Sequence, residues 1–232
     1  MTEELRGQGY KVARQPFRVT GGVSWGVPVP AGRSVNVVAV PRDLDRAEPH
    51  LVVGAHLDTV PQAPGAEDNA SGVAVMLTAA AAVADSRTRL PVVWVAFGAE
   101  EPRGDTDDDH HYGSRAYVAG LSGAERRAVR GMVSLDRVGV GAAVPVGSAR
   151  DSDPVQRALL AAARRAGTPA YGDQFQRSSD HWSFVRAGLP GARLGSTSYA
   201  AYHSPADRPD VVDRAQLART GRLLLAWLAP AG

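Results

Sequence analysis

The chain has 232 residues, with 26 Lys and Arg against 24 Asp and Glu and a formal net charge of +2. This length is typical of one sizeable α/β domain, and the near-neutral charge gives no indication of a nucleic-acid partner. The sequence has no cysteine, which excludes disulfides and thiolate metal sites, so any metal must be held by His, Asp and Glu. No apolar run reaches the length of a membrane span, so we expect no membrane partner.

The N-terminal stretch MTEELRGQGYKV is polar and lacks the apolar centre of a signal peptide. This favours a cytoplasmic protein, or a secreted one if a leader has been removed. The predicted elements of the first half alternate between strands and helices. Strands are expected at 10–19, 34–41, 51–55 and 91–98, a Gly/Pro-rich loop between the first two, and helices at 71–85 and 113–129, the latter interrupted at 120–123.

The second half continues the alternation. Strands are expected at 131–135 and 190–195, and helices at 153–166, 180–188 and 213–229. Asn69 or Ser71 is the expected N-cap of the helix at 71–85. Strands that alternate with helices predict an α/β fold, a three-layer αβα sandwich with a mostly parallel, mixed central sheet. The functional site of such a sheet lies at the carboxyl ends of its strands.

Ionisable residues stand where four of the predicted strands end. They are His56 and Asp58, Glu100 and Glu101, Asp136, and His203 after Tyr202, with Asp68 just before the helix at 71–85. Taken singly, each has a structural interpretation, such as a helix cap or a solvated turn. A parallel sheet brings all of them to one edge, where two metals about 3.5–4 Å apart could share a carboxylate. The remaining carboxylate is then a candidate general base.

Seven motifs in this order resemble one known family over roughly residues 34–229. They are HLD at 56–58, EDNASG at 67–72, GAEE at 98–101, GSRAYV at 113–118, SLDRVG at 134–139, SDHWSF at 179–184 and YHSPAD at 202–207. The family is the co-catalytic zinc aminopeptidases, the bacterial leucyl aminopeptidase and aminopeptidase S type of MH-clan metallopeptidases. The resemblance implies a zinc-exopeptidase fold, one catalytic domain over residues 1–232 and two Zn²⁺ per chain.

The resemblance also implies roles for individual residues. His56 and Asp136 resemble the ligands of one zinc, Glu101 and His203 those of the other, and Asp68 the carboxylate that bridges them. Glu100 resembles the family's general base, and Tyr202 the tyrosine that steadies the developing oxyanion. Asp58 and Asp180 resemble residues that orient the ligands through hydrogen bonds, and Asp207 follows the metal histidine as an Asp commonly does in the family.

The implied activity is that of a hydrolase, an exopeptidase that cleaves the N-terminal peptide bond of peptides with a free N-terminus. Zinc lowers the pKa of a bound water to about 7, so that hydroxide is available at neutral pH. Glu100 would take the water's proton and pass it to the leaving amine. Glu100 and Asp136 are natural partners for the charged α-amine of the substrate.

The sequence departs from the family in three places. Residues 102–112 read PRGDTDDDHHY where the family has a short turn. A calcium loop would need Gly at the position of His110 and Glu at the position of Ala116, which excludes that interpretation. We therefore expect an acidic surface loop, whose His110 and His111 could bind stray metal. Arg137 stands where relatives often carry an apolar residue, which could alter the substrate pocket. The helix that normally opens the domain is expected to be absent or replaced by the first strand pair.

Three alternatives stay open at this stage. A glutaminyl cyclase-like transferase would use one zinc in the same fold, although Asn69 to Gly72 favours the peptidase. The related carboxypeptidases and deacylases place the bridging Asp much farther from the His than the 12 residues (68 − 56) found here. A degenerate receptor-type module would be expected to have lost ligands, and none is missing.

Overall fold

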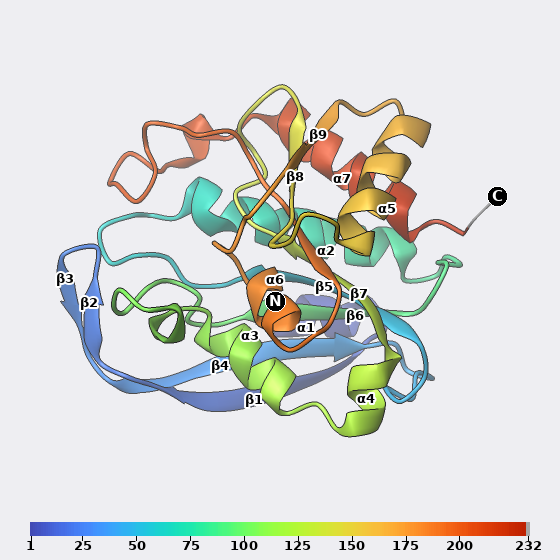
Figure 1. Cartoon of the computed structure of the whole chain (residues 1–232), viewed down its shortest axis with the longest axis horizontal. Helices are drawn as coiled ribbons and strands as arrows, with labels where there is room; N and C mark the ends of the chain where they lie inside the picture. Colours follow the sequence, from blue (N-terminus) through green and yellow to red (C-terminus); the bar gives the residue numbers. More distant parts are fainter. Residues whose placement is uncertain (231–232) are drawn as a thin grey trace.

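The computed structural model describes residues 1–230, through which a mixed eight-stranded sheet runs (Figure 1). In sheet order the strands are β1 (Lys11–Val19), β4 (Gly32–Val40), β6 (Val92–Phe97), β5 (His50–His56), β7 (Val129–Leu135), β10 (Gly191–Leu194), β8 (Val144–Gly147) and β9 (Ala170–Asp173). The four central strands β6, β5, β7 and β10 are parallel, whereas β4 and β8 join them antiparallel. The predicted mixed, mostly parallel sheet is therefore confirmed.

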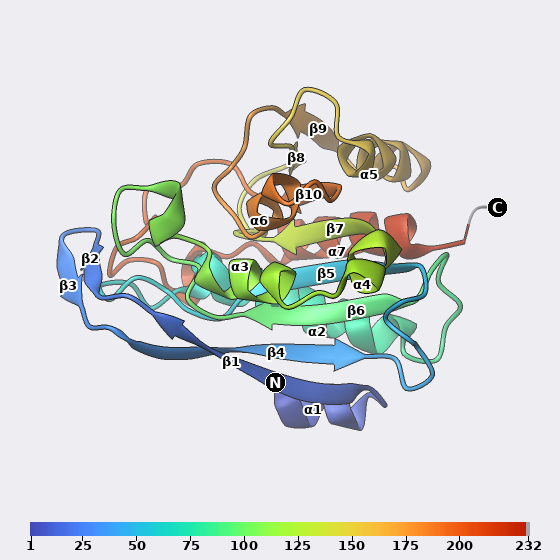
Figure 2. The same cartoon turned by 60° about the horizontal axis from the view of Figure 1, so that its bottom comes forward.

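Helices cover both faces of the sheet, as Figures 1 and 2 show. One face carries α1 (Thr2–Gly7), α2 (Gly72–Val83), α5 (Pro154–Arg165) and α7 (Arg214–Leu228), and the other α3 (Tyr112–Ala119), α4 (Gly123–Ala128) and α6 (His181–Arg186). The predicted αβα layering is confirmed, and the interruption of the helix at 113–129 separates α3 from α4.

Side chains of the central strands alternate between two hydrophobic cores. Val53 and Trp94 pack toward α2, α5 and α7, whereas their neighbours Val52 and Val93 pack toward α3 and α6. Burial on both faces explains why these strands read as continuous apolar runs. Each fully buried side chain of this size contributes roughly 1.5–3 kcal/mol, so the central strands form a rigid support for the loops at their ends.

The N-terminal expectation was wrong, because the chain opens with the short helix α1. Leu5 of α1 is fully buried against the core on the α2 side, and the hydroxyl of Tyr10 donates to the carbonyl of Ala80 in α2. The Gly/Pro-rich loop also contains a hairpin, β2 (Gly22–Ser24) and β3 (Val27–Val29). The strands β8 and β9, at one end of the sheet, were not predicted, because they have four residues each and little periodic pattern.

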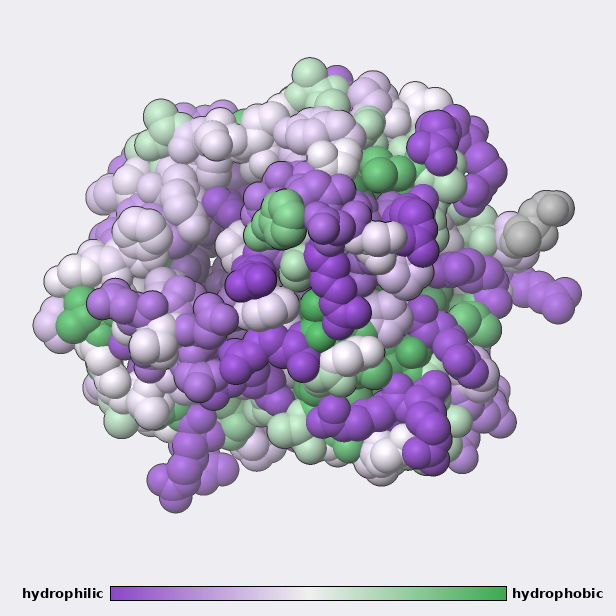
Figure 3. Space-filling model, in the orientation of Figure 1, coloured by the Kyte–Doolittle hydropathy of each residue, from purple (hydrophilic) through white to green (hydrophobic). Residues whose placement is uncertain are grey.

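The surface seen in Figure 3 is predominantly hydrophilic, with apolar side chains scattered between polar ones. No helix within residues 1–230 combines the length and the hydrophobicity that crossing a bilayer requires.

Candidate metal centre

The four parallel central strands deliver the predicted site residues to one edge of the sheet. His56 is the last residue of β5, Asp136 follows β7 directly, and Glu100 and Glu101 follow β6 in the next turn. His203 lies in the loop that leaves β10. Since these strands are neighbours in one sheet, their carboxyl ends bring residues far apart in the sequence into contact.

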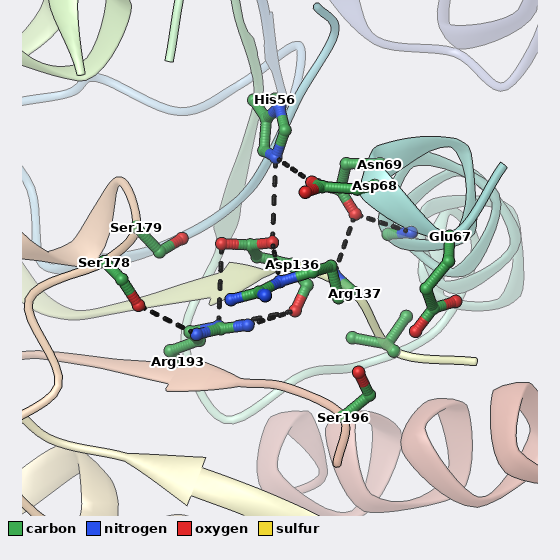
Figure 4. Close-up of polar contacts among 12 residues, drawn as sticks. His56, Glu67, Asp68, Asn69, Asp136, Arg137, Ser178, Ser179, Arg193 and Ser196 are labelled. Carbon is green, nitrogen blue, oxygen red and sulfur yellow. Dashed lines mark hydrogen bonds and ion pairs between the residues drawn. The ribbon is translucent and has the colours of Figure 1, made fainter. Parts of the chain in front are cut away.

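The carboxylate of Asp68 stands between two imidazoles. Its Oδ1 lies 3.1 Å from His56 Nε2, and its Oδ2 lies 3.0 Å from His203 Nε2. On one side His56 Nε2 is also 3.7 Å from Asp136 Oδ1, and on the other His203 Nε2 is 3.3 Å from Glu101 Oε2. Figure 4 shows the first of these sides, with His56 pointing toward both carboxylates. The five residues thus form two groups that share Asp68.

The donor set fits two divalent cations. The ligand atoms of His56, Asp68 and Asp136 lie within 4.8 Å of one another, as do those of Asp68, Glu101 and His203; a further such group joins His56 to Glu100 and Glu101. Three atoms of the set are buried without a hydrogen-bond partner among residues 1–230, namely Glu101 Oε1, Asp136 Oδ1 and His203 Nε2. Buried polar atoms are nearly always paired, and carboxylate and imidazole are ligands that zinc accepts.

The turn that carries Asp68, η1 (Ala66–Ser71), is fixed by two side chains. The carboxylate of Asp207 accepts the backbone N–H groups of Glu67 at 2.9 Å and Asp68 at 3.1 Å. Asn69 Oδ1 accepts the N–H of Gly72, the first residue of α2, at 3.1 Å, so the capping hydrogen bond of that helix comes from Asn69. Asp68 is therefore held by groups on both sides of it.

Asp58 contacts two parts of the site. Its backbone carbonyl accepts a hydrogen bond from His56 Nδ1 at 3.0 Å, which leaves Nε2 of the ring free to bind a metal. Its carboxylate lies 3.9 Å from the same nitrogen and accepts the backbone N–H groups of Glu100 at 3.0 Å and Glu101 at 3.1 Å. Asp58 thus orients the imidazole through its main chain and fixes the turn of the two glutamates through its side chain.

Glu100 has a partner, His111, that the sequence placed in a surface loop as a candidate for stray metal binding. His111, which directly precedes α3, places its Nε2 3.1 Å from Glu100 Oε1, and both side chains are buried. His111 lies at the inner end of the acidic insertion, whose residues Asp105, Asp107 and Asp108 are exposed. Its position two residues before the GSRAYV motif was the only sequence signal that it belongs to the site.

Asp180, which immediately precedes α6, is fully buried, and neither of its carboxylate oxygens has a hydrogen-bond partner among the described residues. Burial raises the pKa of this carboxyl to about 7, and the charge of Glu100 acts in the same direction. His56 and His111 act in the opposite direction. Asp180 is thus coupled to Glu100 and to both imidazoles by charge.

Two arginines flank Asp136. Arg137 Nε lies 3.4 Å from its Oδ1, and Arg193 Nε lies 3.5 Å from its Oδ2 (Figure 4). Arg193 also donates from Nη2 to the carbonyl of Asp136 at 3.0 Å. Burial alone would raise the pKa of Asp136, but Arg193 and His56 hold it well below its usual range. Sequence reasoning missed Arg193, although a charged residue inside a short buried strand was the available signal.

The half of the site around Glu101 has a different electrostatic environment. Within residues 1–230 neither Glu101 nor Asp68 forms an ion pair with Arg or Lys. Burial raises the pKa of Glu101 to about 8. Burial would lower the pKa of His203, but the adjacent carboxylates of Asp68 and Glu101 outweigh it and raise that pKa to about 9. Both shifts favour the protonated forms of Glu101 and His203 in the metal-free chain.

Aromatic side chains line the outer edge of the site. Tyr202 stacks on His203 with 3.7 Å between ring centroids. The guanidinium of Arg137 lies over the ring of Tyr202, with its Cζ 4.4 Å from the ring centroid. Trp25, in the turn of the β2–β3 hairpin, meets His203 edge to face at 4.5 Å. The hairpin that sequence reasoning missed thus contributes a half-exposed indole to the rim.

Comparison with known proteins agrees with this geometry. Residues 36–228 match the model of peptidase family M28. Aminopeptidase YwaD of Bacillus subtilis is 30% identical over 205 residues, which cover 83% of this chain and 44% of that protein. The chain thus spans less than half the length of this curated relative.

Solved structures of two kinds are similar. The zinc aminopeptidase BSAP of Bacillus subtilis superposes with a TM-score of 0.76 at 27% identity, covering 86% of this chain and 50% of that one. A glutaminyl cyclase of Bacteroides thetaiotaomicron, solved with N-acetylhistamine, has a TM-score of 0.83 at 19% identity, covering 100% and 87% of the two chains, and so shares the fold. With a family match over residues 36–228, most of its length, the chain belongs to peptidase family M28.

Proposed function

We propose that the chain is a two-zinc aminopeptidase domain that hydrolyses the N-terminal peptide bond of peptides with a free N-terminus. The observation that carries the proposal is the carboxylate of Asp68, whose two oxygens meet His56 and His203 separately. In this assignment His56 and Asp136 would hold one zinc, Glu101 and His203 would hold the other, and Asp68 would be the ligand common to both groups. The zinc aminopeptidase BSAP and the aminopeptidase YwaD, both similar to this chain, support the choice of metal and of reaction.

Bound zinc supplies a Lewis acid, which polarises the scissile carbonyl and acidifies water. Glu100 belongs to neither of the two ligand groups that share Asp68, so its carboxylate is available as the general base. It takes a proton from the attacking water and delivers it to the leaving amine. His111 holds Glu100 Oε1 by a hydrogen bond, and Asp58 holds the backbone of the same residue.

The remaining groups recognise the substrate. The carboxylates of Glu100 and Asp136 are the candidates to receive the positively charged α-amine, the group whose recognition distinguishes an aminopeptidase from an endopeptidase. The Tyr202 side chain, packed against His203, is the candidate for stabilising the oxyanion.

A second function is favoured by one observation, the two arginines beside Asp136. If their charge kept a cation from that half, a single zinc on Asp68, Glu101 and His203 would remain. A single-zinc acyltransferase of the glutaminyl cyclase kind is the corresponding activity, and glutaminyl cyclases share this fold.

One experiment separates the two functions. The purified chain is assayed on leucyl anilide, N-acetyl-leucyl anilide and glutaminyl peptides, with zinc content measured on the same sample. We expect hydrolysis of the free substrate alone, about two zinc ions per chain, loss of activity with a chelator and recovery with zinc. Cyclisation of N-terminal glutamine with one zinc per chain would favour the transferase, and cleavage of the acetylated substrate would reject the aminopeptidase.

A further inference from the structure

The positive charge of Arg137 is not required to neutralise Asp136. Arg193 already neutralises Asp136, since its Nε lies 3.5 Å from Oδ2 and its Nη2 donates to the carbonyl of the same residue at 3.0 Å. Arg193 is almost completely buried, and its guanidinium is held by Asp136 and by Ser178, whose Oγ accepts a hydrogen bond from Nη1 at 3.0 Å. Arg137 adds a second cation on the opposite oxygen, at 3.4 Å from Oδ1.

The guanidinium of Arg137 is held at the rim of the site. Its backbone N–H donates to Asn69 Oδ1 at 3.0 Å, and its Cζ lies 4.4 Å above the ring of Tyr202. Its side chain keeps 18% of its surface exposed, against 8% for Arg193. A stacked guanidinium is pre-organised, because the aromatic ring fixes its plane while its edges stay free for hydrogen bonds.

The free edges of this guanidinium are its two Nη groups. Arg137 contacts Asp136 through Nε, and within residues 1–230 neither Nη forms a hydrogen bond or an ion pair. Two parallel N–H donors on a planar cation match a carboxylate in geometry and charge. A zinc ion in the neighbouring ligand group would be repelled by this cation, so the arginine weakens metal binding unless it serves another ligand.

We propose that Arg137 forms a subsite for a carboxylate of the substrate, which makes short or acidic peptides the preferred substrates of this chain. The inference rests on the proposed aminopeptidase function. Two substrate carboxylates have the required chemistry, the side chain of an N-terminal Asp or Glu and the free C-terminus of a dipeptide.

The first test compares substrates that differ only in this charge. Aspartyl and glutamyl anilides are compared with asparaginyl and glutaminyl anilides, and Ala-Ala with Ala-Ala amide. We expect the charged member of one pair to have a roughly 10- to 100-fold higher kcat/KM, the range that hydrogen bonds to charged groups provide. The first pair reports on the N-terminal side chain and the second on the C-terminus.

Variants tie that preference to the residue. Arg137→Gln should bring the charged-to-neutral ratio close to 1, and Arg137→Lys, which keeps the charge without the paired donors, should retain part of it. Arg219→Gln is the matched control, because Arg219 lies on α7 and pairs with Asp213 at 3.7 Å. A ratio near 1 in the unmodified chain, or one that Arg137→Gln leaves unchanged, overturns the proposal.

A binding measurement keeps the test independent of turnover. Calorimetry on the zinc-loaded chain compares aspartate with asparagine and Ala-Ala with Ala-Ala amide. Selective binding of a charged member that Arg137→Gln abolishes supports the subsite even if no substrate is hydrolysed, in which case the proposed function alone fails. If neutral substrates are hydrolysed and the added carboxylate changes neither binding nor kcat/KM, the subsite is rejected and the proposed function stands. If Arg137→Gln does not fold, Arg137→Lys supplies the comparison.

Discussion

The two halves of the candidate metal centre share Asp68 and differ in the charge around them. On one side Arg137 and Arg193 stand within 3.5 Å of the Asp136 carboxylate. On the other, no Arg or Lys of the described residues pairs with Glu101. Guanidinium groups repel a divalent cation, and burial strengthens that repulsion because the effective dielectric constant is low. The same kinds of ligand atom are therefore expected to bind zinc with unequal affinity.

This inequality connects the two candidate functions. A chain whose Glu101 half alone is loaded at working zinc concentrations would be a one-metal protein, and one with both halves loaded would be a two-metal peptidase. Relatives with zinc aminopeptidase and glutaminyl cyclase names share the fold, so the fold does not decide between them. We propose that the local charge at Asp136 is the feature that does.

The largest expected effect is at Asp68, the residue common to both halves. Asp68→Ala should remove both zinc ions and abolish hydrolysis, because each half loses a ligand. Asp58→Ala, its matched control, removes a carboxylate that only positions the two glutamates, and should cost roughly 10–100-fold in metal affinity or activity. Zinc content after dialysis measures both variants. Equal metal loss in the two would mean that Asp68 is not shared.

Glu100 and Glu101 separate chemistry from metal binding. Glu100→Gln keeps size and hydrogen bonding but cannot accept a proton, so kcat should fall by about 10²–10⁴-fold with zinc content unchanged. Glu101→Gln should deplete zinc instead, since a neutral amide is a poor ligand. The substitutions are adjacent and chemically identical, and turnover with zinc analysis reads both. Loss of zinc in Glu100→Gln with retention in Glu101→Gln would reverse the assignment.

The inequality of the halves predicts two steps in zinc binding. Titration of the metal-free chain against a competing chelator should give a tight site and one at least about tenfold weaker, a difference of 1.4 kcal/mol. Glu101→Gln should remove the tight step and Asp136→Asn the weak one. Two equal steps, or loss of the tight step in Asp136→Asn, would show that the arginines do not control affinity.

The sequence predicted the core of the fold because its signals were strong. The runs that became β5 and β6 are buried on every residue, and the αβ alternation fixed the layers. The elements it missed are short, such as β8 and α1, where a few tertiary contacts outweigh local pattern.

The ligand positions were predictable because the strand ends and motifs could be located in the sequence. The partners of those ligands were not. His111 reaches Glu100 only because the insertion folds back before α3, and Arg193 reaches Asp136 only because β10 lies beside β7. Both contacts depend on which strands are neighbours, which periodicity does not encode.

Substitution of His111 measures how much the contact between this residue and the general base Glu100 contributes to kcat. Its loss in His111→Leu should lower kcat about tenfold, the value of one hydrogen bond to a charged group, while KM and zinc content stay near those of the unmodified chain. His111→Gln keeps a donor and should recover part of kcat. His110→Leu, a change in the neighbouring residue that bonds to Gly104 instead, is the control. A fall in zinc content would place His111 among the metal ligands.

The smallest expected effect concerns Asp180, whose carboxyl group interacts by charge with Glu100, His56 and His111. Neither of its oxygens forms a hydrogen bond among the described residues. Burial raises its pKa to about 7, above its unfolded value of about 3.9. Between those two values the folded chain holds a proton that the unfolded chain has released, so this group's contribution to stability decreases as pH rises from 4 to 7 and is lowest above 7. Asp180→Asn removes the buried charge.

In the metal-free chain we therefore expect Asp180→Asn to raise Tm at pH 8 by at least about 2–4 °C, the shift that 1 kcal/mol produces at this length, and to change it little at pH 4. Asp151→Asn, at an exposed carboxylate, should be neutral at both pH values. Adding zinc should reduce the gain, because a nearby cation stabilises the ionised Asp180 that the amide cannot reproduce. A lower Tm for Asp180→Asn at pH 8 without zinc would mean that the ionised carboxylate is stabilised by the imidazoles of His56 and His111 more than burial destabilises it.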